Sequence, residues 1–271
     1  LRGILGDEHQ QVLQLMNNLA MAYQGLGQGA QALPLFQENL EIRRRVFGES
    51  HVDTIGSMIT LGLNYLQLGK KQEALDLLEE SESLLRKHFG DEHIYLIQAV
   101  GLQAMVHESA GRLPQAIELQ SKAVDLSVSV LGEESPNTYD ALEGLARMLR
   151  IAGRLDEARE AITNLVDNRT RSMGADNFGT LTATLELAAI ELLTNHPQES
   201  RLHSNRVLKA FESRNDLQSP VALKARVYAA SASQKLRDYP AAAEHYRQAL
   251  ESLPAVFGPQ SEMTASAQVG L

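Results

Sequence analysis

The sequence predicts an all-α fold, a right-handed superhelical solenoid of helix-turn-helix repeats. Three observations predict it: a phrase that recurs at a fixed spacing, helical periodicity on both sides of a turn, and no segment with a strand pattern. The phrase contains a glycine followed three residues later by His, Ser or Asn. Its glycines are spaced 42 residues apart, with one double step across Asp216: Gly6, Gly48, Gly90, Gly132, Gly174 and Gly258. A fixed period of this length is the sequence signature of a solenoid.

This period divides the chain into six units and the start of a seventh. We expect one solenoid domain over residues 1–271, with units at about 6–47, 48–89, 90–131, 132–173, 174–215 and 216–257, and a partial unit at 258–271. Each unit contacts only its neighbours in such an array, so we expect no separable globular domains.

Two helices are expected in each unit. In the first unit Met16, Leu19, Ala20 and Tyr23 recur at i, i+3, i+4 and i+7, which indicates one helix face. Gly27 is expected to end this helix in a left-handed conformation. A second periodic run then reaches the next phrase glycine. The expected helices are 10–26, 30–46, 53–68, 72–88, 95–110, 114–130, 137–152, 156–172, 179–194, 198–213, 221–236 and 240–255, with a thirteenth from about Glu262.

Three further sets of residues keep this register. Small residues at matching places on both helices should let the paired backbones approach closely: Ala20, Gly62, Ala104, Ala146, Ala188 and Ala230 with Ala32, Ala74, Ala116, Ala158, Ser200 and Ala242. The turn between the helices is expected at Gly27, Gly69, Gly111, Gly153, Asn195 and Arg237. N-caps of the first helices are expected at His9, His51, His93, Ser135, Asn177, Ser219 and Ser261.

Composition excludes several classes of function. A formal charge of −9 argues against a nucleic-acid partner, which needs a concentrated basic surface. No apolar run approaches the roughly 18 residues of a membrane span. Zero cysteines exclude disulfides and thiolate metal sites and fit a reducing compartment, so we expect a cytoplasmic location. The chain begins at Leu1, and we expect additional domains of the same full-length protein.

The chain resembles the tetratricopeptide repeat (TPR) superfamily, in the 42-residue form found in kinesin light chains. The marks are the phrase Leu5-Gly6…His9…Asn17-Asn18-Leu19-Ala20…Tyr23 and Ala32 in the second helix. The resemblance implies a helical solenoid that serves protein–protein interaction. It also implies that first-helix asparagines hold a bound peptide backbone, and only Asn17 and Asn18 match them. The equivalent residues further along include Ile59 and Thr60, then Gly101 and Leu102.

In such solenoids the first helices line the concave surface, where we expect a protein or peptide ligand. Counting along the face beside the core stripe gives Asn17, Met21, Gln24, Ile59, Leu63, Leu66, Met105, Glu108, Arg147 and Arg150 as partner-binding residues. Flexible methionines suit varied apolar partners, and arginines can clamp a carboxylate. We therefore hypothesise a groove that is apolar at one end and selects acidic residues at the other. The alternative is that the apolar stripe packs between units and that Arg147 and Arg150 pair with Glu108 and Glu143.

No residues indicate catalysis or a cofactor. The histidines of successive phrases are too far apart for one zinc ion, and no HExxH spacing occurs. Gly25, Gly27 and Gly29 lie between two helices, whereas a phosphate loop follows a strand. We expect a non-catalytic interaction scaffold without cofactor or metal. A regulatory or sensor segment of a larger signalling protein and a self-association module are the alternatives.

Overall fold

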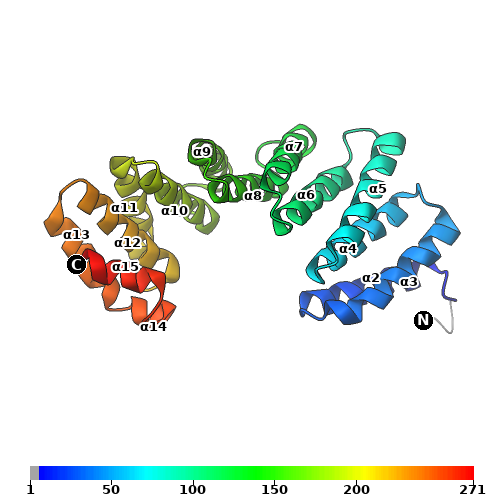
Figure 1. The fold of residues 1–271 in the computed structure, drawn as a ribbon, viewed down its shortest axis with the longest axis horizontal. Helices are drawn as coiled ribbons and strands as arrows, with labels where there is room; N and C mark the ends of the chain where they lie inside the picture. Colours follow the sequence, from blue (N-terminus) through cyan, green and yellow to red (C-terminus); the bar gives the residue numbers. More distant parts are fainter. Residues whose placement is uncertain (1–5) are drawn as a thin grey trace. The chain divides into compact units, whose positions relative to one another are not determined.

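The computed structural model describes residues 6–271 and consists of helices joined by short turns (Figure 1); no strand occurs in this range. Leu5 of the first phrase lies outside the described residues. By compactness the chain divides into two parts, Leu1–Ala141 and Leu142–Leu271. From here on these parts are called unit 1 and unit 2, and the 42-residue segments are called repeats. The boundary falls inside helix α8, and the single array over residues 1–271 stays a prediction.

First and second helices alternate along the chain with the predicted period. The first helices have 16 residues each: α2 (Gln10–Gly25), α4 (Val52–Gln67), α6 (Ile94–Ser109), α8 (Pro136–Ile151), α10 (Phe178–Leu193) and α12 (Pro220–Lys235). The second helices are α3 (Gly29–Phe47), α5 (Lys71–Phe89), α7 (Leu113–Leu131), α9 (Leu155–Met173), α11 (Pro197–Ser213) and α13 (Tyr239–Leu250). Short helices α14 (Leu253–Phe257) and α15 (Glu262–Gly270) follow. These bounds confirm the predicted helices to within two residues, except at α13.

The residues predicted as N-caps begin the first helices. His9, His51 and His93 each accept at Nδ1 from the backbone N–H two residues further on, at 3.1 to 3.2 Å. Asn177 accepts at Oδ1 from Gly179 N at 2.8 Å. These bonds satisfy backbone donors that the first helical turn leaves free. The phrase histidines are therefore caps, as predicted.

The first helices end with left-handed residues at the predicted turn positions, Gly27, Gly69, Gly111, Gly153, Asn195 and Arg237. The residue after each one donates its N–H to a carbonyl five residues back, as Lys70 does to Tyr65 at 2.9 Å. This is the hydrogen bond of a Schellman motif. The phrase glycines adopt a second conformation that only glycine readily takes, with φ 85° and ψ 166° at Gly48.

One helix prediction needs correction, and one loop departs from the repeat. At 240–255 the structure has two helices, because Pro254 has no N–H to donate to the Leu250 carbonyl; α13 ends at Leu250 and α14 starts at Leu253. The missing phrase glycine at Asp216 is replaced by a different turn. There Asn215 takes the left-handed conformation (φ 56°), and Asp216 N donates to Phe211 O at 3.0 Å.

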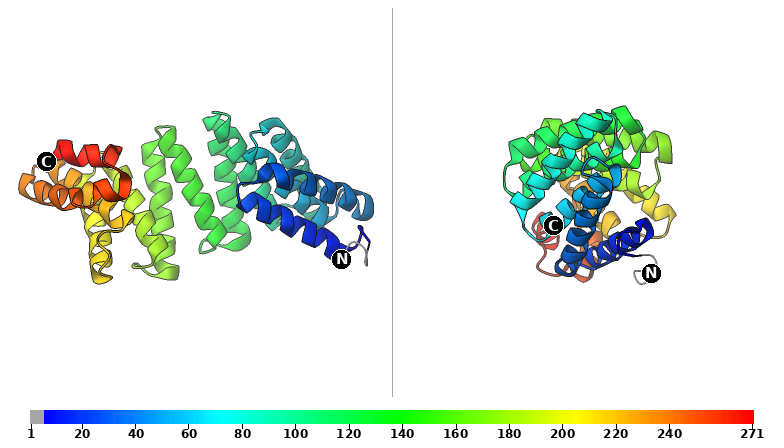
Figure 2. Two further views of the ribbon diagram at one scale, coloured as in Figure 1. Left: turned by 90° about the horizontal axis from the view of Figure 1, so that it is seen from below. Right: turned by 90° about the vertical axis from the view of Figure 1, so that its right-hand side faces the viewer.

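The paired helices approach closely through the predicted small residues. Eleven of these, from Ala20 to Ala242, are at most 3% exposed, and Gly62 is also buried. A Cβ on Gly62 would lie 3.0 Å from Leu78. Figures 1 and 2 show consecutive helices side by side as hairpins within each unit, and in unit 2 α15 packs on α12 and α13.

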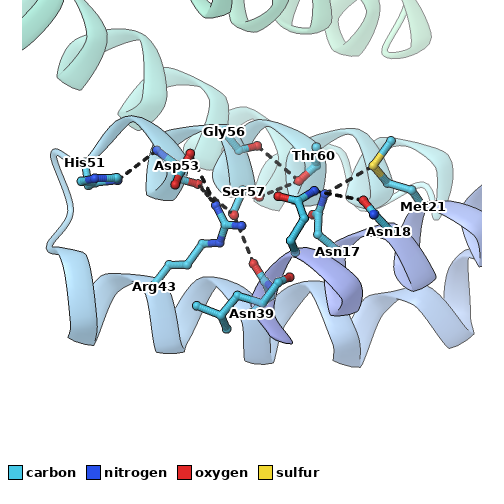
Figure 3. Close-up of polar contacts among 12 residues, drawn as sticks. Asn17, Asn18, Met21, Asn39, Arg43, His51, Asp53, Gly56, Ser57 and Thr60 are labelled. Atoms are coloured by element: carbon cyan, nitrogen blue, oxygen red, sulfur yellow. Dashed lines mark hydrogen bonds and ion pairs between the residues drawn. The ribbon is translucent and has the colours of Figure 1, made fainter. Parts of the chain in front are cut away.

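Buried polar contacts fix successive hairpins in unit 1 (Figure 3). Asn39 on α3 donates from Nδ2 to Leu13 O on α2 at 2.6 Å and accepts at Oδ1 from Ser57 Oγ on α4 at 3.2 Å. Arg43 donates from Nη1 to Asp53 O at 2.8 Å. Because these side chains are buried, the hydrogen bonds compensate their lost hydration. They hold α4 against the first hairpin and so set the position of the first-helix surface.

Candidate functional site

The first helices of unit 1 carry a partly apolar surface, and Glu108 is the one charged residue among those predicted there. Met21 on α2 is 49% exposed and Met105 on α6 is 42% exposed. Leu63 and Leu66 on α4 are half-buried. Asn17 is half-buried and donates from Nδ2 to Met21 Sδ at 3.3 Å. These residues have the exposure that a contact surface for an apolar partner requires.

The other predicted residues of unit 1 are less accessible. Gln24 is half-buried, and its Nε2 is buried without a hydrogen-bond partner. Glu108 is half-buried. Ile59 is 3% exposed and belongs to the hydrophobic core with Ala74 and Leu78. Its side chain holds the helix pair together, so it does not form part of a surface.

Unit 2 has a groove of about 740 Å³, called the groove below, between its first helices. Residues of α8, α10, α12 and α15 form its walls. The lining residues are Ala146, Arg147, Arg150, Thr182, Leu185, Glu186, Ala189, Ile190, Leu192, Leu193, Val221, Lys224, Val227, Tyr228, Ser231, Glu262, Met263 and Ser266. The volume lies in the range of about 300–1,000 Å³ that is typical of ligand sites.

Both predicted arginines line this groove. Arg147 and Arg150 are exposed on α8 at positions i and i+3, which places them on the same helix face. Lys224 on α12 adds a third cation, and its Nζ lies 5.8 Å from the centre of the Phe257 ring. Planar guanidinium groups at this spacing suit a carboxylate that accepts parallel hydrogen bonds.

Carboxylates also contribute to the electrostatics of the groove. Burial raises the pKa of Tyr228, and the charges of Glu186 and Glu262 raise it further, while Arg150 lowers it. Tyr228 therefore remains a neutral hydroxyl at pH 7, able to donate or accept a hydrogen bond. The groove thus combines cations, two carboxylates and a neutral hydroxyl with an apolar wall.

One part of the alternative interpretation can be compared with the structure. Glu143 accepts a hydrogen bond from Arg169 on α9, and the same guanidinium donates to Gly179 O at 3.1 Å. In this ion pair the Arg169 side chain is 11% exposed and the Glu143 side chain is 43% exposed. Of the two carboxylates predicted to pair with Arg147 and Arg150, Glu143 is therefore engaged by Arg169.

Several lining residues were missed because the face was counted only as far as the fourth repeat. Adding 42 and 84 to the residue numbers of that repeat's face, from Asp140 to Arg150, reaches residues of α10 and α12. Seven of the eight positions reached line the groove: Thr182, Leu185, Ala189, Leu192, Lys224, Val227 and Ser231. Glu186 and Tyr228 each lie one residue beyond this register.

No helix within residues 6–271 is both long and apolar enough to cross a membrane. The same residues include no group of three or more His, Cys, Asp or Glu side chains placed to hold a metal ion.

The sequence matches the tetratricopeptide repeat family model at residues 11–87, 95–163 and 138–213. These segments cover more than half of the chain, which therefore belongs to the tetratricopeptide repeat family. Proteins of this family generally serve as non-catalytic scaffolds for protein–protein interaction. A comparison with curated protein sequences gave no significant match.

Solved structures with the same fold include kinesin-light-chain-like repeats. The nearly identical TPR-like repeats of a Podosopora anserina protein described as a kinesin light chain align with a TM-score of 0.67 and 24% identity, covering 75% of this chain and 96% of that one. BtubC (BKLC) from P. vanneervenii aligns with a TM-score of 0.67 and 14% identity over 84% and 91%. PilW, a type IV pilus biogenesis factor, aligns with a TM-score of 0.63 and 16% identity, covering 96% of this chain and 100% of that one. At these identities the likeness shows the fold alone.

Proposed function

We propose that the groove of unit 2 binds a peptide segment of a partner protein. An acidic side chain of the segment contacts Arg147 and Arg150, and its apolar side chains contact the wall formed by Leu193, Val221 and Met263. The observation that carries the proposal is that the arginine pair and the apolar wall line one groove of suitable volume.

Physical chemistry favours a peptide over a small polar substrate. The first helices are fixed by their caps and core contacts, so the groove is preformed and binding costs little ordering of the scaffold. Apolar wall residues provide burial, and the arginines provide selection for a carboxylate. Glu186 and Glu262 disfavour a segment with several adjacent acidic residues, so one acidic residue among apolar residues fits best.

The test starts from random peptides of about a dozen residues displayed on phage and selected on the wild-type protein. Fluorescence polarisation then gives the Kd of the tightest acidic peptide. We expect Arg147→Glu with Arg150→Glu to weaken this peptide by roughly tenfold or more, because both attractive contacts become repulsive. Raising the salt concentration should weaken the wild-type complex as well.

The matched control is Arg206→Glu with Lys209→Glu on α11. These two residues are exposed, have the same i, i+3 spacing and lie outside the groove. The control makes the same change in net charge and should leave the Kd unchanged, with both variants giving the wild-type circular dichroism melting curve. Equal affinities of the two double variants, or selected peptides that lack acidic residues, would contradict the proposal.

A further inference from the structure

Unit 2 has two recesses on its second helices, away from the groove. The first, of about 700 Å³, is lined by residues of α9, α10 and α11, including Glu191 and His203. The second, of about 620 Å³, is lined by residues of α11, α12 and α13 and of the turns beside them, including Arg226 and His245. His203 and His245 are 42 residues apart and so hold equivalent positions in successive repeats.

The first recess has its own internal partner for the histidine. Glu191 is 5% exposed, and its Oε2 lies 3.0 Å from His203 Nδ1. The buried carboxylate therefore has a hydrogen-bond partner, which a buried charge requires.

In the second recess the equivalent partner is missing. The repeat position of Glu191 is taken by Ser233, which is buried behind the lining of the recess and whose Oγ has no hydrogen-bond partner. His245 Nδ1 and Arg226 Nε are also buried without partners. Burial lowers the pKa of His245, and the nearby Arg226 lowers it further. Leaving such buried groups unpaired costs free energy, because they lose their hydration without gaining a partner.

We propose that the second recess binds an acidic side chain of a partner protein, with its carboxylate accepting hydrogen bonds from Arg226. The carboxylate takes the role that Glu191 has in the preceding repeat. His245 in its neutral form donates from one ring nitrogen, as its tautomer allows. This surface lies on other helices than those that form most of the groove, so it serves a second contact beyond the proposed function.

The charged residues at the rim of the recess indicate which charged groups the ligand carries. Glu212, Glu244 and Glu251 line it, and Glu244 already pairs with Arg247 at 2.7 Å. These three carboxylates repel a doubly charged phosphate more strongly than they repel a singly charged carboxylate ligand. Glu212 and Glu251 instead favour basic groups beside the bound acid. A partner segment with an acidic residue flanked by basic residues matches this arrangement.

The experiment uses two capped peptides, Lys-Glu-Lys and Lys-Gln-Lys, and free glutamate. Binding is followed from the NMR signals of the His245 ring, which faces the recess. In the wild-type protein Lys-Glu-Lys should shift these signals saturably and bind roughly tenfold more tightly than Lys-Gln-Lys. Free glutamate should bind more weakly than Lys-Glu-Lys, because it lacks the flanking basic side chains.

Two variants decide the role of Arg226. Arg226→Gln should erase the preference for Lys-Glu-Lys in a protein that still melts cooperatively. The substitution removes an Nε atom that is buried without a hydrogen-bond partner, and it also removes the attraction of the guanidinium to Glu251 and Glu212. Arg206→Gln, an arginine that lines the first recess, should keep the preference. Equal binding of the two peptides to wild type, a preference that survives in Arg226→Gln, or tighter binding of free glutamate would each overturn the proposal. Because the readout is at His245, failure here is independent of the arginine test in the groove.

Discussion

The first helices of unit 1 and unit 2 have the same length but differ in surface chemistry and in the N-cap residue, which is histidine in unit 1 and Asn177 or Ser219 in unit 2. Helix α2 has no ionisable side chain except Tyr23, and the exposed side chains on this face of unit 1 include Met21 and Met105. In unit 2 the corresponding surface forms a groove with three cations and two carboxylates. The repeat therefore constrains the small buried residues and the helix ends, while the solvent side of the first helices can take different chemistry in different repeats.

The two units also differ in the residues of the turns between paired helices, and this difference affects stability. Unit 1 has glycine at each turn between paired helices, with φ from 73° to 74° at Gly27, Gly69 and Gly111. Unit 2 has Asn195 and Arg237 in the same conformation, at φ 61° and 62°. A left-handed conformation costs a non-glycine residue free energy that glycine does not lose. Unit 2 keeps the fold with less favourable turn residues, so its repeats should open more easily.

Substituting a phrase glycine should have the largest effect on stability. Gly90 has φ 77° and ψ −169°, a region that is almost restricted to glycine, and an added Cβ would meet no atom within 4 Å. Gly90→Ala should therefore lower the free energy of unfolding by about 1–3 kcal/mol through backbone strain alone. Urea denaturation measures this change.

The natural control for this prediction is Asp216, which occupies the phrase position in unit 2. The turn there uses Asn215 instead, so Asp216→Gly should change stability little. If Gly90→Ala costs no more than Asp216→Gly, the phrase conformation does not require glycine and the comparison between the loops is wrong.

Exchanging the residues of the paired-helix turns should have a smaller effect, of opposite sign in the two units. Arg237→Gly in unit 2 should raise the free energy of unfolding by about 1 kcal/mol, because glycine adopts φ near 60° without strain. Gly69→Ala in unit 1 should lower it by a similar amount. Thermal melting of both variants checks the signs, and a destabilising Arg237→Gly would show that the arginine side chain contributes contacts that outweigh backbone strain.

Much of the fold could be predicted from the period alone, because a 42-residue register fixes helix ends through residues of special conformation. The N-cap histidines and the turn at Arg237 followed from position, although neither residue type is a typical choice there. The register failed where local chemistry overrides it. Pro254 ends the helical run after α13, and the loop at Asp216 replaces the phrase glycine with a left-handed residue at Asn215, as in the turns that end the first helices.

The candidate site was predictable only in part. Arg147 and Arg150 follow from counting along a helix face, since positions three and four apart share a side. Ile59 shows the limit of the count: the surface face adjoins the core face, each residue turns the helix by about 100°, and a residue at the border can belong to either. The recess at Arg226 could not be predicted, because a missing hydrogen-bond partner depends on side chains from three helices.

The smallest expected effect is a dependence of stability on pH that involves one histidine in each unit. Burial lowers the pKa of His107 in unit 1, as does the charge of Arg112. Burial and Arg226 lower the pKa of His245 in unit 2, and the carboxylates of Glu244 and Asp238 oppose them. Above the ordinary histidine pKa of 6.5 both folded and unfolded chains hold these residues neutral.

Below that pH the unfolded chain takes up protons before the folded chain does, so the free energy of unfolding falls until the folded pKa is passed. His245→Gln and His107→Gln should each flatten the decline in stability between about pH 6.5 and lower values. Urea denaturation at a series of pH values measures the slope. Because Arg226 adds to the shift at His245, Arg226→Gln should also flatten it, and His245→Gln in that background should have a reduced effect. An unchanged slope in His245→Gln would mean that the ring is as readily protonated in the folded protein as in water. The pKa of His245 would then not be lowered by burial and Arg226, contrary to the electrostatics described for the second recess.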